Sequence, residues 1–172
     1  MPQIKITPLN DAPHFRAALS ELLIEAVADG GSVSFLYPLQ MDVADTFWED
    51  SLAAAVKGKR VVLGAVDGET LAGTVTLLLD CPPNQPHRAE IAKLIVRISH
   101  RGLGIGSALM LEAERLAVER GRTLLVLDTA VEGGAAPMYE ALGYILAGVI
   151  PDYALKPHGG LTGTAIYWKR IT

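Results

Sequence analysis

The first part of the chain alternates between strand-like and helix-like spacing of apolar residues. Apolar and polar side chains alternate from Gln3 to Thr7, and this period of two predicts a strand. Asn10 or Asp11 then supplies a helix start signal. Apolar residues recur every three or four positions from Phe15 to Val27 until Gly30-Gly31 ends the pattern, which predicts one amphipathic helix.

The next segment changes from irregular to helical and then to β-rich. Residues Ser32 to Leu39 are polar and aromatic without a clear period, so we expect a loop and interpret it as a candidate substrate lid. A second helix is expected around Val43 to Lys57. Two β-rich runs follow, Val61 to Val66 and Thr70 to Asp80, and the Asp67-Gly68 dipeptide between them is favoured in tight hairpins. The two runs therefore predict antiparallel strands.

A glycine-rich segment separates a strand from a helix in the middle of the chain. Residues Cys81 to Pro86 include three prolines and predict a loop. Arg88 to Ile98 then has the apolar content of a longer strand. Three alternating glycines follow at positions 102–106, and apolar residues keep helical spacing from Ile105 until Gly121. This order predicts an amphipathic helix that begins inside a glycine loop.

The C-terminal part predicts three strands and a short helix. Leu124 to Leu127 form an apolar run, which we expect to be a short buried strand ending in Asp128. Gly134 to Leu142 favour a short helix, and Tyr144 to Ile150 and Thr164 to Lys169 favour two closing strands. The whole chain therefore has the predicted order β-α-α-β-β-β-α-β-α-β-β.

Composition favours one globular domain and excludes several functional classes. The chain shows no repeat or linker, so we expect a single domain over 1–172; half of its residues are apolar, enough for a packed core. No apolar run approaches the ~20 residues of a membrane helix, and the start MPQIKITPLND lacks the apolar stretch of a secretory signal. The net charge is −4 with scattered Lys and Arg, so nucleic acid is not an expected partner. The lone Cys81 cannot form an internal disulfide, and we expect a cytoplasmic protein.

The segment from Arg101 to Ser107 has the physical properties of a phosphate-binding loop. The first amides of a helix have no internal partners, and the helix dipole adds positive potential there. Glycines let the backbone approach a ligand closely, and Arg101 adds a positive charge. A glycine turn without a ligand is the plain alternative. A dinucleotide fingerprint would need a third glycine where Ser107 stands, and a Walker loop would need a Gly-Lys-Ser/Thr sequence that is missing here.

Two blocks of the sequence resemble the GNAT superfamily of N-acetyltransferases. The stretch from Leu94-Ile95-Val96 through Arg101-Gly102-Leu103-Gly104-Ile105-Gly106 resembles the superfamily signature R/Q-x-x-G-x-G/A after its fourth strand. Residues Met138 to Tyr144 are similar to the superfamily's helix-to-strand segment. The resemblance implies an α/β fold, α+β by some schemes, with a mixed and mostly antiparallel central sheet flanked by helices. It also implies acetyl-CoA as the co-substrate.

The resemblance further implies which residues hold acetyl-CoA. The pantetheine arm is expected to pair with the backbone of Leu94, Ile95 and Val96, whose apolar side chains equally suit a core strand. The pyrophosphate is expected on the glycine loop, which comprises Arg101, Gly102, Leu103, Gly104, Ile105, Gly106 and Ser107. The chain departs from many relatives at Ile98, where they have proline, and at Glu132, where they have asparagine. The second departure affects one contact to the pantetheine arm.

Three residues are expected to carry the chemistry. Tyr139 matches the superfamily tyrosine that protonates the departing CoA thiolate, although an aromatic on a short helix also suits packing. The acceptor amine must lose a proton, and Asp128 follows a buried strand at a place where α/β sheets often bind ligands. Glu90 shares the parity of Leu94 unless a bulge reverses it, and it also suits a solvated strand end. Blocks such as Pro151-Asp152-Tyr153 resemble the tabtoxin resistance acetyltransferases, which raises both carboxylates as bases, with Asp128 ahead.

The expected activity is acetyl transfer to the amine of a small-molecule acceptor by direct attack in a ternary complex. Cys81 has no histidine placed to activate it, which argues against an acetyl-cysteine, and the histidines lack metal spacing, so no metal is expected. A detoxification or resistance role and a homodimer are further expectations, and a non-catalytic acyl-CoA-binding sensor is the alternative.

Candidate acceptor-site side chains are Phe35, Tyr37, Trp48, Tyr153, Tyr167, His87 and His158. The loops 32–39 and 153–162 are expected to select the acceptor.

Overall fold

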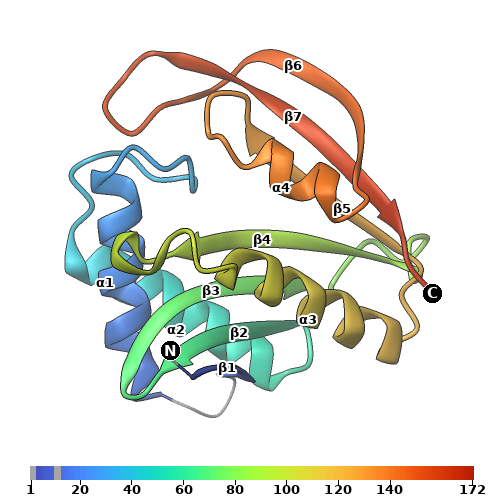
Figure 1. Ribbon diagram of the computed structural model, residues 1–172, viewed down its shortest axis with the longest axis horizontal. Coiled ribbons are helices and arrows are strands. Elements are labelled where there is room, and N and C mark those ends of the chain that lie inside the picture. Colours follow the sequence, from blue (N-terminus) through green and yellow to red (C-terminus); the bar gives the residue numbers. More distant parts are fainter. Residues whose placement is uncertain (1–2, 10–12) are drawn as a thin grey trace.

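The computed structural model describes residues 3–9 and 13–172, which form a seven-stranded sheet with helices on both faces (Figure 1). The strands are β1 Ile4–Pro8, β2 Arg60–Asp67, β3 Thr70–Leu78, β4 Arg88–Val96, β5 Leu124–Ala130, β6 Ile145–Leu155 and β7 Leu161–Arg170. The helices are α1 Phe15–Ala28, α2 Met41–Val56, α3 Ile105–Glu119 and α4 Ala136–Ala141, with a single 3-10 turn, η1, at Ile98–His100. The predicted element order and mixed sheet are confirmed; the helix start signal at Asn10 or Asp11 lies outside the described residues.

The sheet has the strand order β1-β2-β3-β4-β5-β7-β6. Neighbouring strands are antiparallel except β4 and β5, which are parallel. The chain crosses between these two strands through α3, and a parallel pair needs such a connection. The strands and helices that surround this parallel pair are the ones that form the site described below.

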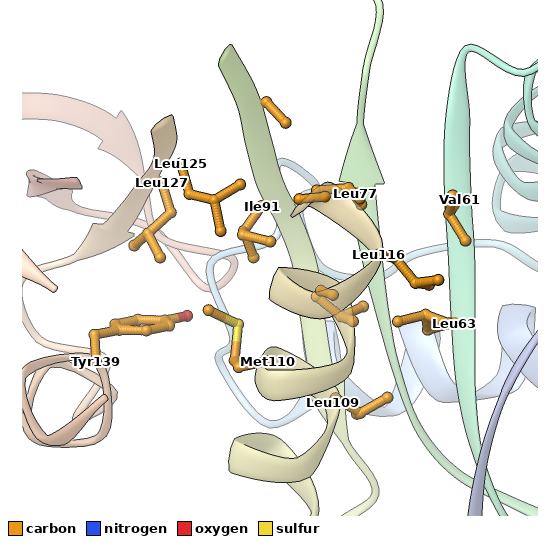
Figure 2. Close-up of a cluster of buried hydrophobic side chains, with 14 of the residues drawn as sticks. Val61, Leu63, Leu77, Ile91, Leu109, Met110, Leu116, Leu125, Leu127 and Tyr139 are labelled. Atoms are coloured by element: carbon orange, nitrogen blue, oxygen red, sulfur yellow. The ribbon is translucent and has the colours of Figure 1, made fainter. Parts of the chain in front are cut away.

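Two apolar clusters, one on each face of the sheet, form the core. The first packs α3 and α4 against the sheet and includes Leu63, Ile91 and Leu125 (Figure 2). The second packs α1 and α2 against the opposite face around Trp48, which is fully buried. Because side chains along a strand alternate between faces, the neighbours Val62 and Leu63 belong to different clusters. β2 and β3 are covered on both faces, which explains why their sequences contain few charged residues and are buried almost throughout.

A bulge at Lys93 changes which way the side chains of β4 point. Lys93 has a φ of 53°, and the pairing of β4 with β3 shifts register beside it. Ile91 consequently packs in the cluster under α3, whereas Ile95, of the same parity, packs in the cluster under α1 and α2. Glu90 and Leu94 therefore point to opposite faces of the sheet, although their equal parity in the sequence suggested one face.

Several predicted strands end at a different residue in the structure, and the differences in β4, β5 and β6 bear on the site. β4 ends at Val96, and Ile98 begins the turn η1. β5 continues to Ala130 because its last residues pair with β7, so Asp128 lies inside the strand instead of ending it. β6 continues past Pro151, which lacks an N–H donor, because an edge strand with a register shift at this point can leave that residue unpaired.

The extension of β6 changes the place of one candidate acceptor residue. Tyr153 lies within β6 and not in the loop that the sequence predicted. Asp152 beside it has a φ of 50°, which accompanies the register shift between Ile150 and Ala154.

Across the part of the chain that the structure describes, no helix is both long enough and apolar enough to cross a membrane.

Candidate active site

A cleft of about 710 Å³ opens at the place where β4 and β5 separate, and we call it the central cleft. Parallel pairing of the two strands covers only Arg88–Glu90 against Leu124–Val126. Beyond these residues the cleft extends between the strands toward β7 and the loop after α1. Its ionisable and tyrosine side chains include Glu90, Lys93, Asp128, Tyr139, Tyr153 and Lys156.

The second half of β4 presents one free edge to this cleft. On one side Ile95 and Val96 remain paired with β3, while the pairing with β5 on the other side has already stopped. Leu94 and Ile95 line the cleft, and Val96 packs against the cluster under α3. The Val96 carbonyl accepts a 3.4 Å hydrogen bond from Nε of Arg101. The other backbone groups on this part of the edge are available to an extended ligand that runs beside the strand.

The glycine loop leads from η1 into α3. Gly102 and Gly104 have φ values of 77° and 78°, a left-handed conformation that favours glycine, and Gly104 directly precedes the helix. A Cβ at either position would meet no atom within 4 Å, so the space in front of this backbone is open. Ile105 is buried in the core and anchors the first turn of α3, whereas Leu103 is exposed. At the two glycines the loop thus presents bare backbone to its surroundings.

Arg101 connects the glycine loop to the end of α1. Its guanidinium Nη1 lies 2.8 Å from Oδ2 of Asp29, and Asp29 also lines the central cleft. The nearby carboxylate of Glu25 accepts a 3.0 Å hydrogen bond from the amide of Ile98. Glu25 of α1 and Asp29 at its C-terminal end therefore hold the segment from η1 to the glycine loop. Local sequence patterns do not indicate these two contacts.

Asp128 projects from β5 into the central cleft. Leu125 and Leu127 point into the core, so the alternation of the strand places Asp128 on the other face, where it is exposed to the cleft. The hydroxyl of Thr164 on β7 donates a 3.1 Å hydrogen bond to Oδ2 of Asp128. The carboxylate is therefore accessible and oriented.

Tyr139 enters the site from α4 and is 6% exposed. Figure 2 shows its ring in the cluster with Leu127 and Met110, and its centroid lies 6.0 Å from those of Tyr144 and Tyr167. Burial, and to a smaller degree the negative charge of Asp128, raises the pKa of the Tyr139 phenol to about 12. The tyrosine therefore stays protonated across the physiological range.

Glu90 lies in the cleft lining but has a partner of its own. Its carboxylate forms an ion pair with Arg88, whose guanidinium also donates a 2.6 Å hydrogen bond to Gln85. This pairing fixes Glu90 at the edge of the site where β4 and β5 are still joined. The structure thus gathers Glu90, Asp128 and Tyr139 around one cleft, with Asp128 free of any cationic partner within 4.0 Å among the described residues.

Lys93 is a cleft residue that the sequence analysis missed. Its ammonium donates a 3.3 Å hydrogen bond to the hydroxyl of Ser34 and lies 5.6 Å from the ring centroid of Phe47. Burial lowers the pKa of Lys93, an effect that the charge of Asp128 opposes. The signal that could have found it is a single charged residue within the apolar run from Ile91 to Val96.

The aromatic residues proposed for the acceptor site lie in three different places. Trp48 and Tyr167 are buried core residues, and the hydroxyl of Tyr167 donates to Glu140 over 3.0 Å. Tyr153 lines the cleft. Phe35 packs edge-on against Phe47, and Tyr37 stacks with His158, so both belong to contacts that hold the loop after α1. Of that loop, residues 30–34 reach the cleft.

Glu132 lines the cleft and forms a 3.1 Å ion pair with Lys156. Groups of three or more His, Cys, Asp or Glu side chains that could hold a metal ion are absent from residues 3–9 and 13–172.

Comparison with known sequences identifies relatives of one family. The family model described as Acetyltransferase (GNAT) family matches residues 24–144, a range that includes the glycine loop, Asp128 and Tyr139. N-acetyltransferase 8B of Rattus norvegicus is 34% identical over 82 residues, a segment that covers 46% of this chain. The match spans only 37% of the length of that relative.

Comparison with solved structures gives similar folds over nearly the whole chain. An N-acetyltransferase from Staphylococcus aureus Mu50 superposes with a TM-score of 0.83 at 17% identity and covers 99% of both chains. The protein yncA from Salmonella typhimurium, solved with its cofactor acetyl-CoA, has a TM-score of 0.78 at 17% identity over 98% of this chain and 94% of its own. A ribosomal-protein-alanine N-acetyltransferase from Brucella melitensis has a TM-score of 0.79 at 19% identity over 97% and 99%. At these identities the likeness concerns the fold.

Proposed function

This chain belongs to the GNAT acetyltransferase family, and we propose that it transfers the acetyl group of acetyl-CoA to the amine of a small-molecule acceptor. The family uses acetyl-CoA as the acetyl donor. The observation that carries the proposal is the meeting of an exposed carboxylate, Asp128, and a buried protonated phenol, Tyr139, at one cleft beside a free strand edge. Proton removal and proton donation are the two tasks that amine acetylation requires.

The glycine loop and the free edge of β4 fit acetyl-CoA. Open space in front of Gly102 and Gly104 would admit a pyrophosphate, and the amides of residues 105–107 begin α3 without helical acceptors. We propose that these groups and Arg101 hold the pyrophosphate, while residues 94–96 pair with the pantetheine arm. Bound there, acetyl-CoA supplies an activated acetyl thioester.

Asp128 is proposed as the base that takes the proton of the acceptor ammonium. Its carboxylate faces the cleft, and the hydrogen bond from Thr164 holds one of its oxygens while the other stays open to an amine or a bridging water. Glu90 is the second candidate base, and its ion pair with Arg88 argues for a lesser part, such as holding a water at the cleft edge.

Tyr139 is proposed as the acid that protonates the departing CoA thiolate. A phenol whose pKa is about 12 keeps its proton across the physiological range. In water the departing thiolate is a weaker base than this phenolate, since a free thiol has a pKa of about 8.5. An apolar surrounding also penalises the thiolate charge, so we propose that the phenol donates a hydrogen bond to the developing charge and that the proton follows as the C–S bond breaks. Direct transfer between the two bound substrates needs no covalent enzyme intermediate.

A two-stage experiment tests this function. Thermal unfolding is measured with acetyl-CoA, NAD and ATP separately, because a ligand of the native state raises the midpoint. Of the three compounds, only acetyl-CoA should raise the midpoint of thermal unfolding. Thiol release from acetyl-CoA is then followed across a library of amines, and at least one amine should accelerate it. Binding of acetyl-CoA without acceleration by any amine would instead favour a non-catalytic acyl-CoA sensor.

We also propose a homodimer that forms through β6. This strand is at the edge of the sheet, so among the described residues only β7 pairs with it. Its large apolar residues are about half exposed: Ile145, Leu146, Val149, Ile150 and Leu155. An exposed apolar edge strand is a surface that proteins normally cover. Analytical ultracentrifugation at micromolar concentration should give twice the mass of one chain. The Val149→Lys variant should give the mass of a single chain.

A further inference from the structure

The cleft contains a positive charge that the proposed chemistry does not use. Lys93 stands at the bulge of β4, where the reversed backbone directs its side chain toward α2 and the loop after α1. The left-handed conformation is unfavourable for a residue with a side chain, and a cost of roughly 1–2 kcal/mol is typical. The residue that adopts this unusual backbone conformation is therefore also one that brings an ammonium into the central cleft.

The charge of this ammonium is not balanced by a direct partner. Among the residues that the structure describes, no carboxylate lies within 4.0 Å of Lys93, and its hydrogen-bond partner is the neutral hydroxyl of Ser34. The negative charge of Asp128 acts on it from a longer distance, and Arg60 adds a second positive charge. A half-buried cation is costly without an anion, so the site gains from an anionic ligand.

The other cleft lysine shows the contrast. Lys156 also lines the cleft, but its ammonium is paired with Glu132 at 3.1 Å. Its charge is therefore already balanced within the protein. The cleft thus holds one cation that is satisfied by the chain and one that is not.

We propose that Lys93 is an anion subsite that binds a carboxylate, phosphate or phosphonate group of the acceptor. This inference rests on the proposed function and specifies its substrate class: an amine that carries an anionic group a short distance from the nitrogen. Asp128 attracts the ammonium end of such a molecule and Lys93 the anionic end, so the two charges orient it across the cleft. The hydrogen bond to Ser34 holds the lysine in place and links the loop after α1 to acceptor recognition.

A structural role for Lys93 is the competing explanation. Its contacts with Ser34 and Phe47 join β4 to the loop and to α2, and these contacts alone would stabilise the fold. The two roles differ in what a variant changes. Loss of a structural contact lowers the stability of the protein and reduces activity with all acceptors alike. Loss of an anion subsite changes the preference between acceptors.

Matched acceptor pairs test the inference. Each pair consists of an amino acid and its carboxamide, which differ in the anionic group, and the ratio of their kcat/KM values is measured. The wild type should prefer the carboxylate roughly 10-fold or more, a typical effect for a hydrogen bond to a charged group. Lys93→Met should remove most of this preference, mainly through the KM of the carboxylate. Lys93→Arg should restore part of it, and Lys57→Met, at an exposed lysine outside the cleft lining, should leave the ratio unchanged.

A binding measurement separates this inference from the proposed function. Thermal midpoints are compared for the carboxylate and carboxamide of each pair in the presence of CoA, which cannot react. Carboxylates should give the larger shift in the wild type, and Lys93→Met should remove this difference. That result supports the anion subsite even if no amine is acetylated. If no amine is acetylated, only the proposed function fails. Equal shifts in the wild type, or an equal ratio in Lys93→Met and the wild type, would overturn the anion subsite whatever the activity.

Discussion

The hydroxyl of Thr164 on β7 donates a 3.1 Å hydrogen bond to Oδ2 of Asp128 on β5, so the proposed base is held by the neighbouring strand. Thr164 is buried, and Asp128 is exposed to the cleft. This contact joins a rigid part of the sheet to a carboxylate that must meet a mobile acceptor.

Thr164→Val is expected to lower turnover roughly 3- to 10-fold, because the loss of one hydrogen bond of about 0.5–1.5 kcal/mol leaves Asp128 less well oriented. The valine keeps the shape of the side chain, so the midpoint of thermal unfolding should change little. Steady-state kinetics with the best acceptor of the library gives the test. Unchanged kcat in a folded variant would show that this bond does not position the base.

Asp128→Asn is expected to lower kcat/KM by roughly 10²-fold or more at neutral pH, since general base catalysis is typically worth 10²–10⁴-fold. The deficit should shrink as the pH rises past the pKa of the acceptor amine, because the amine then loses its proton without help. Glu90→Gln serves as the matched control and should have a smaller effect. A pH profile of Asp128→Asn that runs parallel to the wild type would assign the base elsewhere.

Tyr139→Phe should keep stability and acetyl-CoA affinity while turnover falls, up to the 10²–10⁴-fold that proton donation can contribute. The loss should be smaller for acyl donors whose thiol has a lower pKa. In the wild type the raised pKa of about 12 keeps the phenol protonated, so the rate should not decline near pH 10 through this group. An alkaline decline with a pKa near 10 that disappears in Tyr139→Phe would contradict the buried, protonated donor.

The ion pair between Arg101 and Asp29 leads to a prediction about acetyl-CoA affinity. Arg101→Gln should weaken binding roughly 10-fold, because a charged contact to the pyrophosphate is lost. Asp29→Asn removes the ion pair but keeps the cation, so its affinity should equal or exceed that of the wild type. Isothermal titration measures both constants. Equal weakening in the two variants would mean that the pair orders the loop and that Arg101 does not contact the phosphates.

Glycine substitutions are a poorer test of the same loop. A Cβ at Gly106 would lie 3.1 Å from Sδ of Met138, so a side chain there would disturb the packing of α3 against α4 as well as any ligand. Gly104 has open space but a φ of 78°, and a side chain would strain the start of α3. The charge variants at Arg101 and Asp29 avoid both problems.

The element order was predictable because each element carries its own period. The helical spacing from Phe15 to Val27 and the glycine loop before Ile105 are local signals that packing did not override. The relation between Glu90 and Leu94 was not predictable, because the bulge at Lys93 puts a non-glycine residue in a left-handed conformation that no sequence pattern marks.

Contacts between segments that are distant along the chain were also not predictable from the sequence. Ser34 and Lys93 meet across the loop and β4, and Arg101 meets Asp29 across the loop and α1. Both pairs depend on how far the strands separate, which is a property of the whole sheet. The acceptor, the resistance role, the homodimer and the cytoplasmic location stay predictions.

The most direct measurement of the central claim follows the acetyl group itself. Acetyl-CoA with a ¹³C-labelled acetyl group is incubated with the protein and an accelerating amine, and mass spectrometry quantifies labelled amide against free thiol. The proposed function predicts one labelled acetyl-amine for each thiol released, and a large loss of both in an Asp128→Asn, Tyr139→Phe double variant that still binds acetyl-CoA. Thiol release without labelled amine, or labelled product at the wild-type rate in the double variant, would contradict it.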